Sequence, residues 1–192
     1  MPALRSYRGT PWRVIAPDPP RYDLWPEPVR LAWRLSGALV PCGPGVRGIG
    51  WPENPVVRLA ALAPWFTAHQ VATHRTAAWV WGAARSIGES IELSMLPGYR
   101  RPIGTPAELR IRELRGLPED AIHLGQFLVT SPRRTILDLL YQPESFDRRD
   151  VITCRLLSQR VPGGLQHIAD HIAEHRRPHR SRAQQRLRGL LP

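Results

Sequence analysis

The segment Thr73–Gly82 (THRTAAWVWG) constrains the fold most, because it begins at a helix-capping residue and its interior is apolar on nearly every side. The hydroxyl of Thr73 can accept a hydrogen bond from a free backbone N–H of the first helical turn, so Thr73 is the expected N-cap. Gly82 can adopt the left-handed conformation that ends a helix. A surface helix would show a polar face, which residues 77–81 lack. The segment therefore predicts a short helix buried in the core, reached through a strand at Gln70–Ala72.

A second segment, Leu128–Leu140 (LVTSPRRTILDLL), has the same organisation. Ser131 is the expected N-cap, and Pro132 stands at the first helical position, where its missing N–H costs nothing. Four apolar residues of the following helix supply a face for the core: Ile136, Leu137, Leu139 and Leu140. The second segment therefore also predicts a strand that leads into a capped core helix.

The remaining periodicities predict an α+β fold in which a small mixed sheet is packed with helices. Apolar and polar residues alternate in Ile91–Leu96 and Glu108–Leu114, as in half-buried strands, and Ile122–Thr130 is predicted to be one further strand. Helices are expected at Pro55–Ala63 with Asn54 as its cap, at Asp147–Gln159 with Asp147 as its cap, and at Gly164–Arg176.

The first 53 residues predict a different organisation. Prolines crowd residues 1–28, and because proline fixes φ and lacks a backbone donor, an extended arm is expected, with Trp12, Tyr22 and Trp25 holding it to the body. A short amphipathic helix should follow at Pro28–Ser36, with Val29, Leu31, Ala32 and Leu35 facing inward. Residues 38–51 contain several Pro and Gly residues and predict a small β-ribbon. The expected divisions are a Pro-rich arm with a partial winged-helix-like segment at 1–53, an α+β domain at 54–176 and a basic tail at 177–192.

The charge of the chain indicates the class of its partner. The net charge is +11, and all 27 basic residues are arginine because the sequence contains no lysine. Residues 61–150 are nearly neutral, whereas the two flanking regions carry the excess of arginine. A planar guanidinium group can bond two phosphate oxygens at once, so this distribution suggests a polyanion or an acidic protein as partner. A solvated basic surface in an arginine-rich proteome is the alternative explanation.

Several classes of protein are disfavoured by what the sequence lacks. The sequence contains no run of about 18 apolar residues, so it predicts no membrane span. Residues 1–21 do not resemble a secretory signal. Cys42 and Cys154 lie far apart and not at metal-ligand spacing, which favours two reduced thiols in the cytoplasm. Ser131 lacks the flanking glycines of a nucleophile elbow, and no phosphate-binding glycine motif is present. No catalytic residue and no cofactor is therefore expected.

Three histidines recur at helical spacing in His167, His171 and His175. Such spacing places imidazoles on one face, as in helical zinc sites. The apolar stripe of this helix is Leu165, Ile168 and Ile172, so the histidines should lie beside the core, in water. No fourth ligand is evident, and no metal site is predicted. Arg133 and Arg134, in the first turn of their helix, indicate a neighbouring carboxylate or a bound anion, and ion pairs with the acidic segment 144–150 are favoured over an anion site.

The two capped segments, with the predicted strands between them, resemble the AbiEi-type antitoxins of type IV toxin–antitoxin systems, in the form found in high-GC bacteria. The resemblance covers about residues 55–175, and Leu128–Leu140 is its more specific part. It implies a winged helix-turn-helix near the N-terminus, of which Gly37–Arg47 resembles the last helix and wing. The upstream part is too short for two further helices, so this region is shortened.

The function that the resemblance implies is that of a non-enzymatic antitoxin. Such a protein counteracts a nucleotidyltransferase-like toxin, or represses its own operon by binding duplex DNA at the operator. The alternative is a nucleic-acid-binding or protein-interaction module that has lost its helix-turn-helix. The residues expected to bind nucleic acid are the arginines of the predicted wing and helix and those of the C-terminal run: Arg30, Arg34, Arg47, Arg176, Arg177, Arg180, Arg182 and Arg186.

Overall fold

The structure is a computed structural model that describes residues 18–67, 69–101, 104–114, 116–175 and 177–191. Most of the predicted arm, including Trp12, and one expected site residue, Arg176, lie outside these ranges. The described elements are, in chain order, η1 (Tyr22–Leu24), α1 (Glu27–Leu35), β1 (Leu39–Cys42), β2 (Gly45–Gly48), α2 (Pro55–Ala61), η2 (Ala63–Trp65), β3 (Gln70–Ala72), α3 (His74–Val80), β4 (Ile91–Met95), β5 (Leu109–Arg112), α4 (Leu117–Asp120), β6 (Ala121–Leu124), β7 (Phe127–Thr130), α5 (Pro132–Tyr141), α6 (Arg148–Ser158), α7 (Gly164–Glu174) and α8 (Arg180–Arg188).

The centre of the fold is a five-stranded mixed sheet in the order β5-β4-β3-β7-β6. Strands β3 and β7, which lead into the two capped helices, lie side by side and run parallel. Strand β4 pairs antiparallel with β3 and parallel with β5. The fold is therefore α+β with a small mixed sheet packed with helices, as the sequence predicts.

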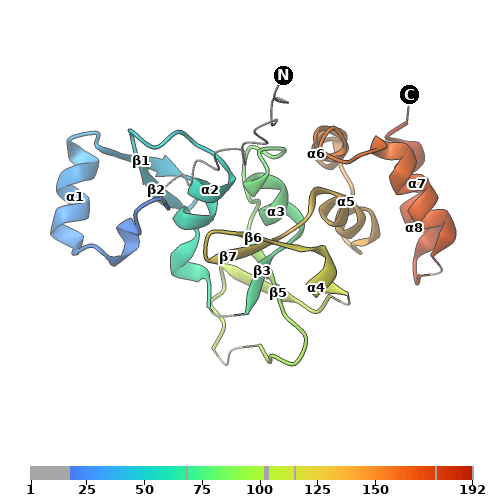
Figure 1. The fold of residues 1–192 in the computed structure, drawn as a ribbon, viewed down its shortest axis with the longest axis horizontal. Helices are drawn as coiled ribbons and strands as arrows, with labels where there is room; N and C mark the ends of the chain where they lie inside the picture. The colour runs from blue at the N-terminus through green and yellow to red at the C-terminus, as the bar shows by residue number, and fades with distance from the viewer. Residues whose placement is uncertain (1–17, 68, 102–103, 115, 176, 192) are drawn as a thin grey trace, which may run out of the picture.

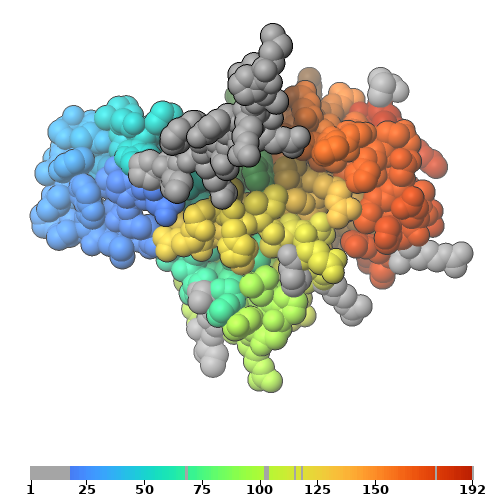
Figure 2. Space-filling view, in the orientation of Figure 1, coloured from blue at the N-terminus to red at the C-terminus, as the bar shows by residue number. Residues whose placement is uncertain are grey.

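Helices extend the molecule on both sides of this sheet (Figure 1). Helix α3 packs against β4, β7 and α5, and α5 in turn contacts α6 and α8. The hairpin β1–β2 and α1 form one end of the molecule, and α7 and α8 form the other. Figure 2 shows the surfaces of these two ends separated by the sheet region. No helix in the described part of the chain has both the length and the apolar character needed to span a membrane.

Three of the predicted helix caps are confirmed. The side chain of Asn54 accepts a hydrogen bond from the backbone N–H of Val57 at 3.0 Å. The hydroxyl of Ser131 accepts from the backbone N–H of Arg134 at 3.1 Å. Asp147 forms a reciprocal capping box at the start of α6 with Asp150. These contacts are local in sequence, which is why the capping pattern was sufficient to predict them.

The fourth predicted cap is wrong, because a neighbouring strand supplies the acceptor. Thr73 makes no capping bond, and its hydroxyl instead donates to the backbone carbonyl of Glu92 at 3.4 Å. The carboxylate of Glu92, on β4, accepts from the backbone N–H of Arg75 at 2.9 Å. The start of α3 is thus satisfied by a residue 17 positions away along the chain.

Trp79 lies at the centre of the core with 2% of its surface exposed, as predicted for α3. The turn between β1 and β2 packs onto its ring: a Cβ atom on Gly43 would lie 2.6 Å from the ring, and Gly43 has φ +58°, so only glycine fits there. Cys42 belongs to the same buried cluster. The core therefore runs across the boundary that the sequence placed between residues 53 and 54.

Two predictions about individual segments require correction. Residues 122–130 form two strands rather than one, because Gly125, with φ +60°, begins a turn after Leu124 and the chain folds back as an antiparallel hairpin. The helix expected at 28–36 is present as α1, but none of its residues is buried. Leu31 and Leu35, which were expected to face inward, are 50% and 81% exposed.

The C-terminal segment is not a tail as expected. Residues 180–188 form α8, in which Ala183 and Leu187 lie one turn apart and are buried together with Leu190. The high density of arginine concealed this apolar stripe in the sequence. The two cysteines are free and buried, in agreement with the prediction of reduced thiols.

Candidate nucleic-acid interface

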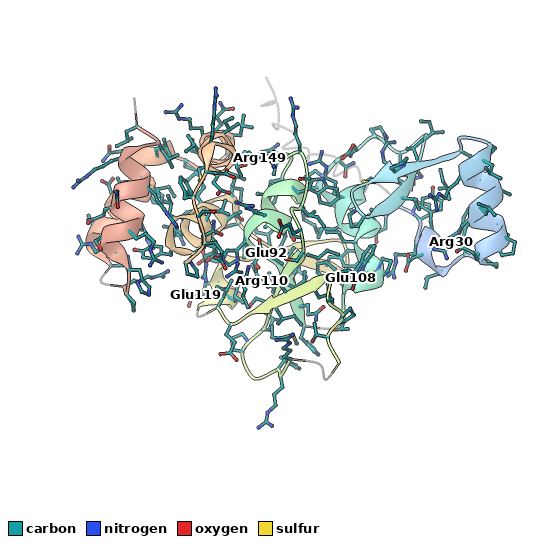
Figure 3. All side chains as sticks on the ribbon, turned by 180° about the vertical axis from the view of Figure 1, so that it is seen from behind. Arg30, Glu92, Glu108, Arg110, Glu119 and Arg149 are labelled. Carbon is teal, nitrogen blue, oxygen red and sulfur yellow. The ribbon has the colours of Figure 1, made fainter. Side chains whose placement is uncertain are left out.

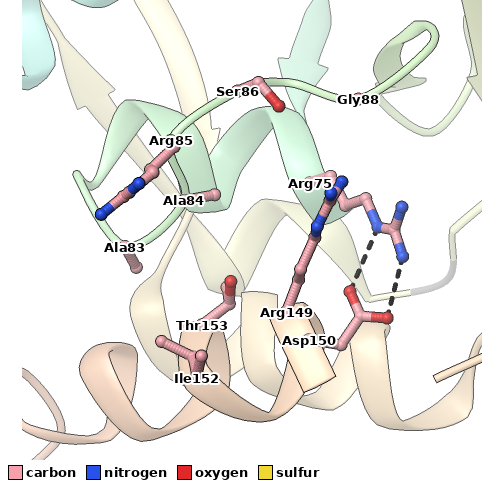
Figure 4. A pocket seen from close by; sticks show the side chains of 10 residues that line it. All are labelled: Arg75, Ala83, Ala84, Arg85, Ser86, Gly88, Arg149, Asp150, Ile152 and Thr153. Atoms are coloured by element: carbon pink, nitrogen blue, oxygen red, sulfur yellow. Dashed lines mark hydrogen bonds and ion pairs between the residues drawn. The ribbon is translucent and has the colours of Figure 1, made fainter. Parts of the chain in front are cut away.

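A recess of about 550 Å³ lies between the α3–β4 connection and the first turns of α6. Arg75 of α3, Arg85 of the connection and Arg149 of α6 line it, together with the carboxylate of Asp150. Figure 4 shows Arg149 beside Arg75 on one side of the recess and Arg85 on the other side, with its guanidinium group directed away from them. We call these three arginines the arginine groove.

The turn that ends α3 positions Arg85 at the recess. The backbone N–H of Gly82 donates to the carbonyl of Trp79, and that of Ala83 donates to the carbonyl of Ala78, which is the hydrogen-bond pattern of a Schellman cap. Gly82 has φ +79°, as the sequence predicts for the closing residue. This turn reverses the chain at the helix end and leads it along α6.

Arg75 is the only member of the arginine groove with an acidic partner in the described structure. Its Nε and Nη2 atoms donate to the two carboxylate oxygens of Asp150 at 3.1 and 2.8 Å. Burial works to lower the pKa of Arg75, but the hydrogen bonds and charge of Asp150 outweigh it, and the pKa is raised above its usual value. Asp150 is buried and its charge is neutralised by this pair.

Arg85 and Arg149 are exposed, and within the described chain neither guanidinium group forms a hydrogen bond or an ion pair. Arg148 lies beside Arg149 in the first turn of α6 and is likewise unpaired. The groove is thus lined by three arginines, of which, among the described residues, only Arg75 is paired with a carboxylate, that of Asp150. Such a surface is suited to bind phosphate oxygens, which guanidinium bonds in a bidentate way.

The N-terminal arginines expected to bind nucleic acid differ in their availability. Arg30 forms an exposed ion pair with Glu27. Arg47 donates to the backbone carbonyls of Gly48 at 3.3 Å and Trp51 at 2.9 Å, so it stabilises the loop after the hairpin. Arg34 is exposed at the end of α1 and has no partner in the described structure. Figure 3 shows Arg30 at the end of the molecule, well away from Arg149.

Most of the C-terminal arginines expected at the site hold the fold together. Arg186 donates to the backbone carbonyls of Leu139, Leu140, Gln142 and Glu144, at the end of α5. Arg182 also donates to the carbonyl of Gln142, at 3.4 Å, and Arg180 donates to that of Ala173 at 3.0 Å. Arg177 is exposed, and its side chain forms no hydrogen bond or ion pair with any other described residue.

The ion pairs of Arg133 and Arg134 correct a further prediction. Arg133 pairs with Asp120 at 2.7 Å, and Arg134 pairs with Asp138 at 2.8 Å and with Asp120 at 3.2 Å. The acidic segment that was expected to bind them instead supplies Glu144 to Arg110 and Arg112 on β5. Sequence distance misled the assignment, because α4 brings Asp120 beside the start of α5.

The three histidines of α7 do not come together as a group. His171 and His175 stack with ring centroids 4.2 Å apart. Nδ1 of His171 lies 3.4 Å from Nη1 of Arg133. Burial, with His175 and Arg133, lowers the pKa of His171. Among the described residues no group of three or more His, Cys, Asp or Glu side chains is placed to hold a metal ion.

Sequence reasoning missed Arg85, Arg148 and Arg149. A signal for two of them was present, since Arg148 and Arg149 directly follow the capping residue Asp147 and therefore project from a first helical turn. That Arg149 lines the same recess as Arg85 depends on how α6 packs, which the sequence pattern does not contain. No protein-family model matches the chain, and no curated protein shows significant similarity to it.

Proposed function

We propose that the chain is a non-enzymatic, cytoplasmic antitoxin that binds duplex DNA and thereby represses its own operon. The observation that carries this proposal is the arginine groove, in which Arg85 and Arg149 are exposed without a partner within the described chain. Arginines that hold the fold have carbonyl or carboxylate partners, so the unpaired ones are available for phosphate. A protein with net charge +11 also attracts a polyanion at long range.

Arg34 and the hairpin β1–β2 would supply the contacts that depend on base sequence. The hairpin follows α1 as a wing follows the last helix of a winged helix-turn-helix, in keeping with the resemblance to AbiEi-type antitoxins. The arginine groove would contribute affinity for the phosphate backbone, which carries no sequence information. The antitoxin activity itself, directed at a nucleotidyltransferase-like toxin, rests on the resemblance.

The test is fluorescence anisotropy with a duplex from the chain's own promoter and a scrambled duplex of equal length. The double variant Arg85→Gln/Arg149→Gln should weaken binding to both duplexes and lower the slope of log affinity against log salt by about 2, because each lost phosphate contact removes about 0.9. Arg34→Gln should reduce the preference for the promoter. The control is Glu108→Gln, a change at an exposed residue just before β5 that does not line the arginine groove. No binding of either duplex at low salt would refute the proposal.

A protein-interaction module is the second candidate, favoured by the exposed apolar surface of α1. Leu31, Trp33 and Leu35 are each at least 41% exposed, and apolar patches of this kind often mark protein contacts. Co-expression with a nucleotidyltransferase-like toxin separates the two functions. The wild type should then restore growth, whereas the variant Leu31→Ser/Leu35→Ser should not, although it still binds DNA. This outcome would favour a protein contact through α1.

A further inference from the structure

A second recess, of about 450 Å³, lies between the start of α3, the end of α5 and the edge strand β5. It is separate from the arginine groove, and no residue lines both. Side chains from all three elements line it: His74, Arg110, Arg112, Asp138, Tyr141 and Gln142. In Figure 3, Arg110 lies beside Glu92 near the middle of the molecule, in agreement with their pairing across β4 and β5.

Three of these side chains are almost fully buried and yet have polar atoms without a partner in the described structure. These atoms are Nδ1 of His74, Oδ2 of Asp138 and the side-chain amide nitrogen of Gln142. The three residues are 3%, 7% and 4% exposed. Buried polar atoms are nearly always hydrogen-bonded, because leaving them unpaired forfeits the bonds they make to water. All three residues line this one recess, and this coincidence points to a ligand as the missing partner.

The geometry around these atoms is held by the fold. Oδ1 of Asp138 accepts from Nε of Arg134 at 2.8 Å, which fixes the carboxyl group. Gln142 is the C-cap residue of α5, and its backbone carbonyl accepts from Nη1 of Arg186 at 2.7 Å. His74 has φ +46° at the first position of α3, a left-handed conformation that is uncommon outside glycine and that recurs at ligand sites.

The chemistry of the lining narrows the class of ligand. Asp138 can accept a hydrogen bond, Gln142 can donate one, and the ring of His74 can do either. Tyr141 adds an aromatic ring to the wall, on which a flat ring can stack. At the rim the guanidinium group of Arg110 pairs, among the residues that the structure describes, only with Glu144 and is half exposed, so it retains donors for an anion.

We propose that this recess binds a mononucleotide. The edge of a nucleobase presents adjacent donors and acceptors, which would meet Asp138 and Gln142, while Tyr141 would stack on the ring and Arg110 would bind the phosphate. An inorganic anion would leave Oδ2 of Asp138 unpaired, and an apolar ligand would leave all three buried atoms unpaired. The volume lies within the usual range of small-ligand sites. This inference does not depend on DNA binding by the arginine groove.

Isothermal titration calorimetry on the full chain tests the proposal with the four common nucleoside 5′-monophosphates, adenosine and inorganic phosphate. At least one monophosphate should bind at millimolar concentration or below, and inorganic phosphate should bind more weakly than that monophosphate. Gln142→Met keeps the length of the side chain but removes its donor, and should weaken nucleotide binding about tenfold or more. Its melting temperature should be unchanged or higher, because the variant removes an unpaired buried group. Arg110→Gln should weaken the monophosphate but not the nucleoside.

The matched control is Arg149→Gln, which changes the arginine groove and should leave nucleotide binding within twofold of wild type. Loss of binding in that variant would place the ligand in the groove and overturn the proposal. It is also overturned if no monophosphate binds at several millimolar, or if Gln142→Met binds as tightly as wild type. Binding of a single-stranded oligonucleotide that Gln142→Met abolishes, without binding of any monophosphate, would assign the recess to nucleic acid instead.

Discussion

At the scale of single residues, Trp79 shows how much one side chain can contribute to this core. Its ring contacts the turn at Gly43 on one side, and the guanidinium group of Arg58 lies over it with Cζ 5.1 Å from the ring centre on another. Trp79→Ala should lower the free energy of unfolding by about 3–5 kcal/mol, because neighbours on several elements cannot collapse into so large a void. Urea unfolding of both proteins measures this. A loss below about 1 kcal/mol would contradict the central position of the ring.

His74 provides a prediction about acid stability. Burial and the nearby charge of Arg112 lower the pKa of His74 to about 3, from an ordinary value of 6.5. The unfolded chain therefore binds a proton more readily than the folded one, and stability that is present above pH 6.5 should be lost as pH falls toward 3.

His74→Asn should reduce this loss, since asparagine does not titrate and tolerates a positive φ. Between about pH 7 and about pH 4.5 the wild type should lose roughly 2–3 kcal/mol more stability than the variant, which corresponds to about two pKa units. Unfolding curves at the two pH values measure the difference. Equal losses would show that the ring is accessible to protons in the folded state.

At the scale of elements, α8 caps α5 through Arg186. The last carbonyls of a helix lack partners within the helix, and Arg186 donates to four carbonyls at the end of α5. Arg186→Gln should therefore cost about 1.5–3 kcal/mol, the range for hydrogen bonds from a charged group.

Arg188→Gln is the matched control for this prediction. It removes the same charge from the last residue of α8, an exposed side chain that has no partner in the described chain. It should change stability by less than about 0.5 kcal/mol. Thermal and urea unfolding compare the two variants. If both lower stability equally, the loss comes from net charge and not from the cap of α5.

The strand and helix boundaries show where local patterns suffice. The caps at Asn54, Ser131 and Asp147 were predictable because donor and acceptor lie within three residues of each other. Thr73 fits the same pattern but makes no capping bond, because the carboxylate of Glu92 on β4 accepts the hydrogen bond from the backbone N–H of Arg75. A pattern confined to ten residues contains no information about an acceptor on another strand.

At the scale of the whole molecule, the continuous core predicts one cooperative unfolding transition. Cys42 of the hairpin, Trp79 of α3 and Leu187 of α8 belong to one buried cluster, although the sequence divided them among three regions. Calorimetric and van't Hoff enthalpies should agree, and far-UV and near-UV signals should change together. Two resolved transitions would indicate that the chain unfolds as separate domains, as the predicted boundary near residue 53 implies.

The sequence alone determined the class of fold and the helices that begin with their own caps. It also identified Trp79 as core and the excess of arginine as the main electrostatic property, because these depend on composition, periodicity and contacts between near neighbours. Only the tertiary structure decided which arginines are available. Arg186 and Arg47 bind backbone carbonyls, whereas Arg85 and Arg149 line an open recess without a partner in the described structure. The physical reason is that a guanidinium group takes whichever acceptor the packing of other elements brings within about 3 Å, and that acceptor is often distant along the chain.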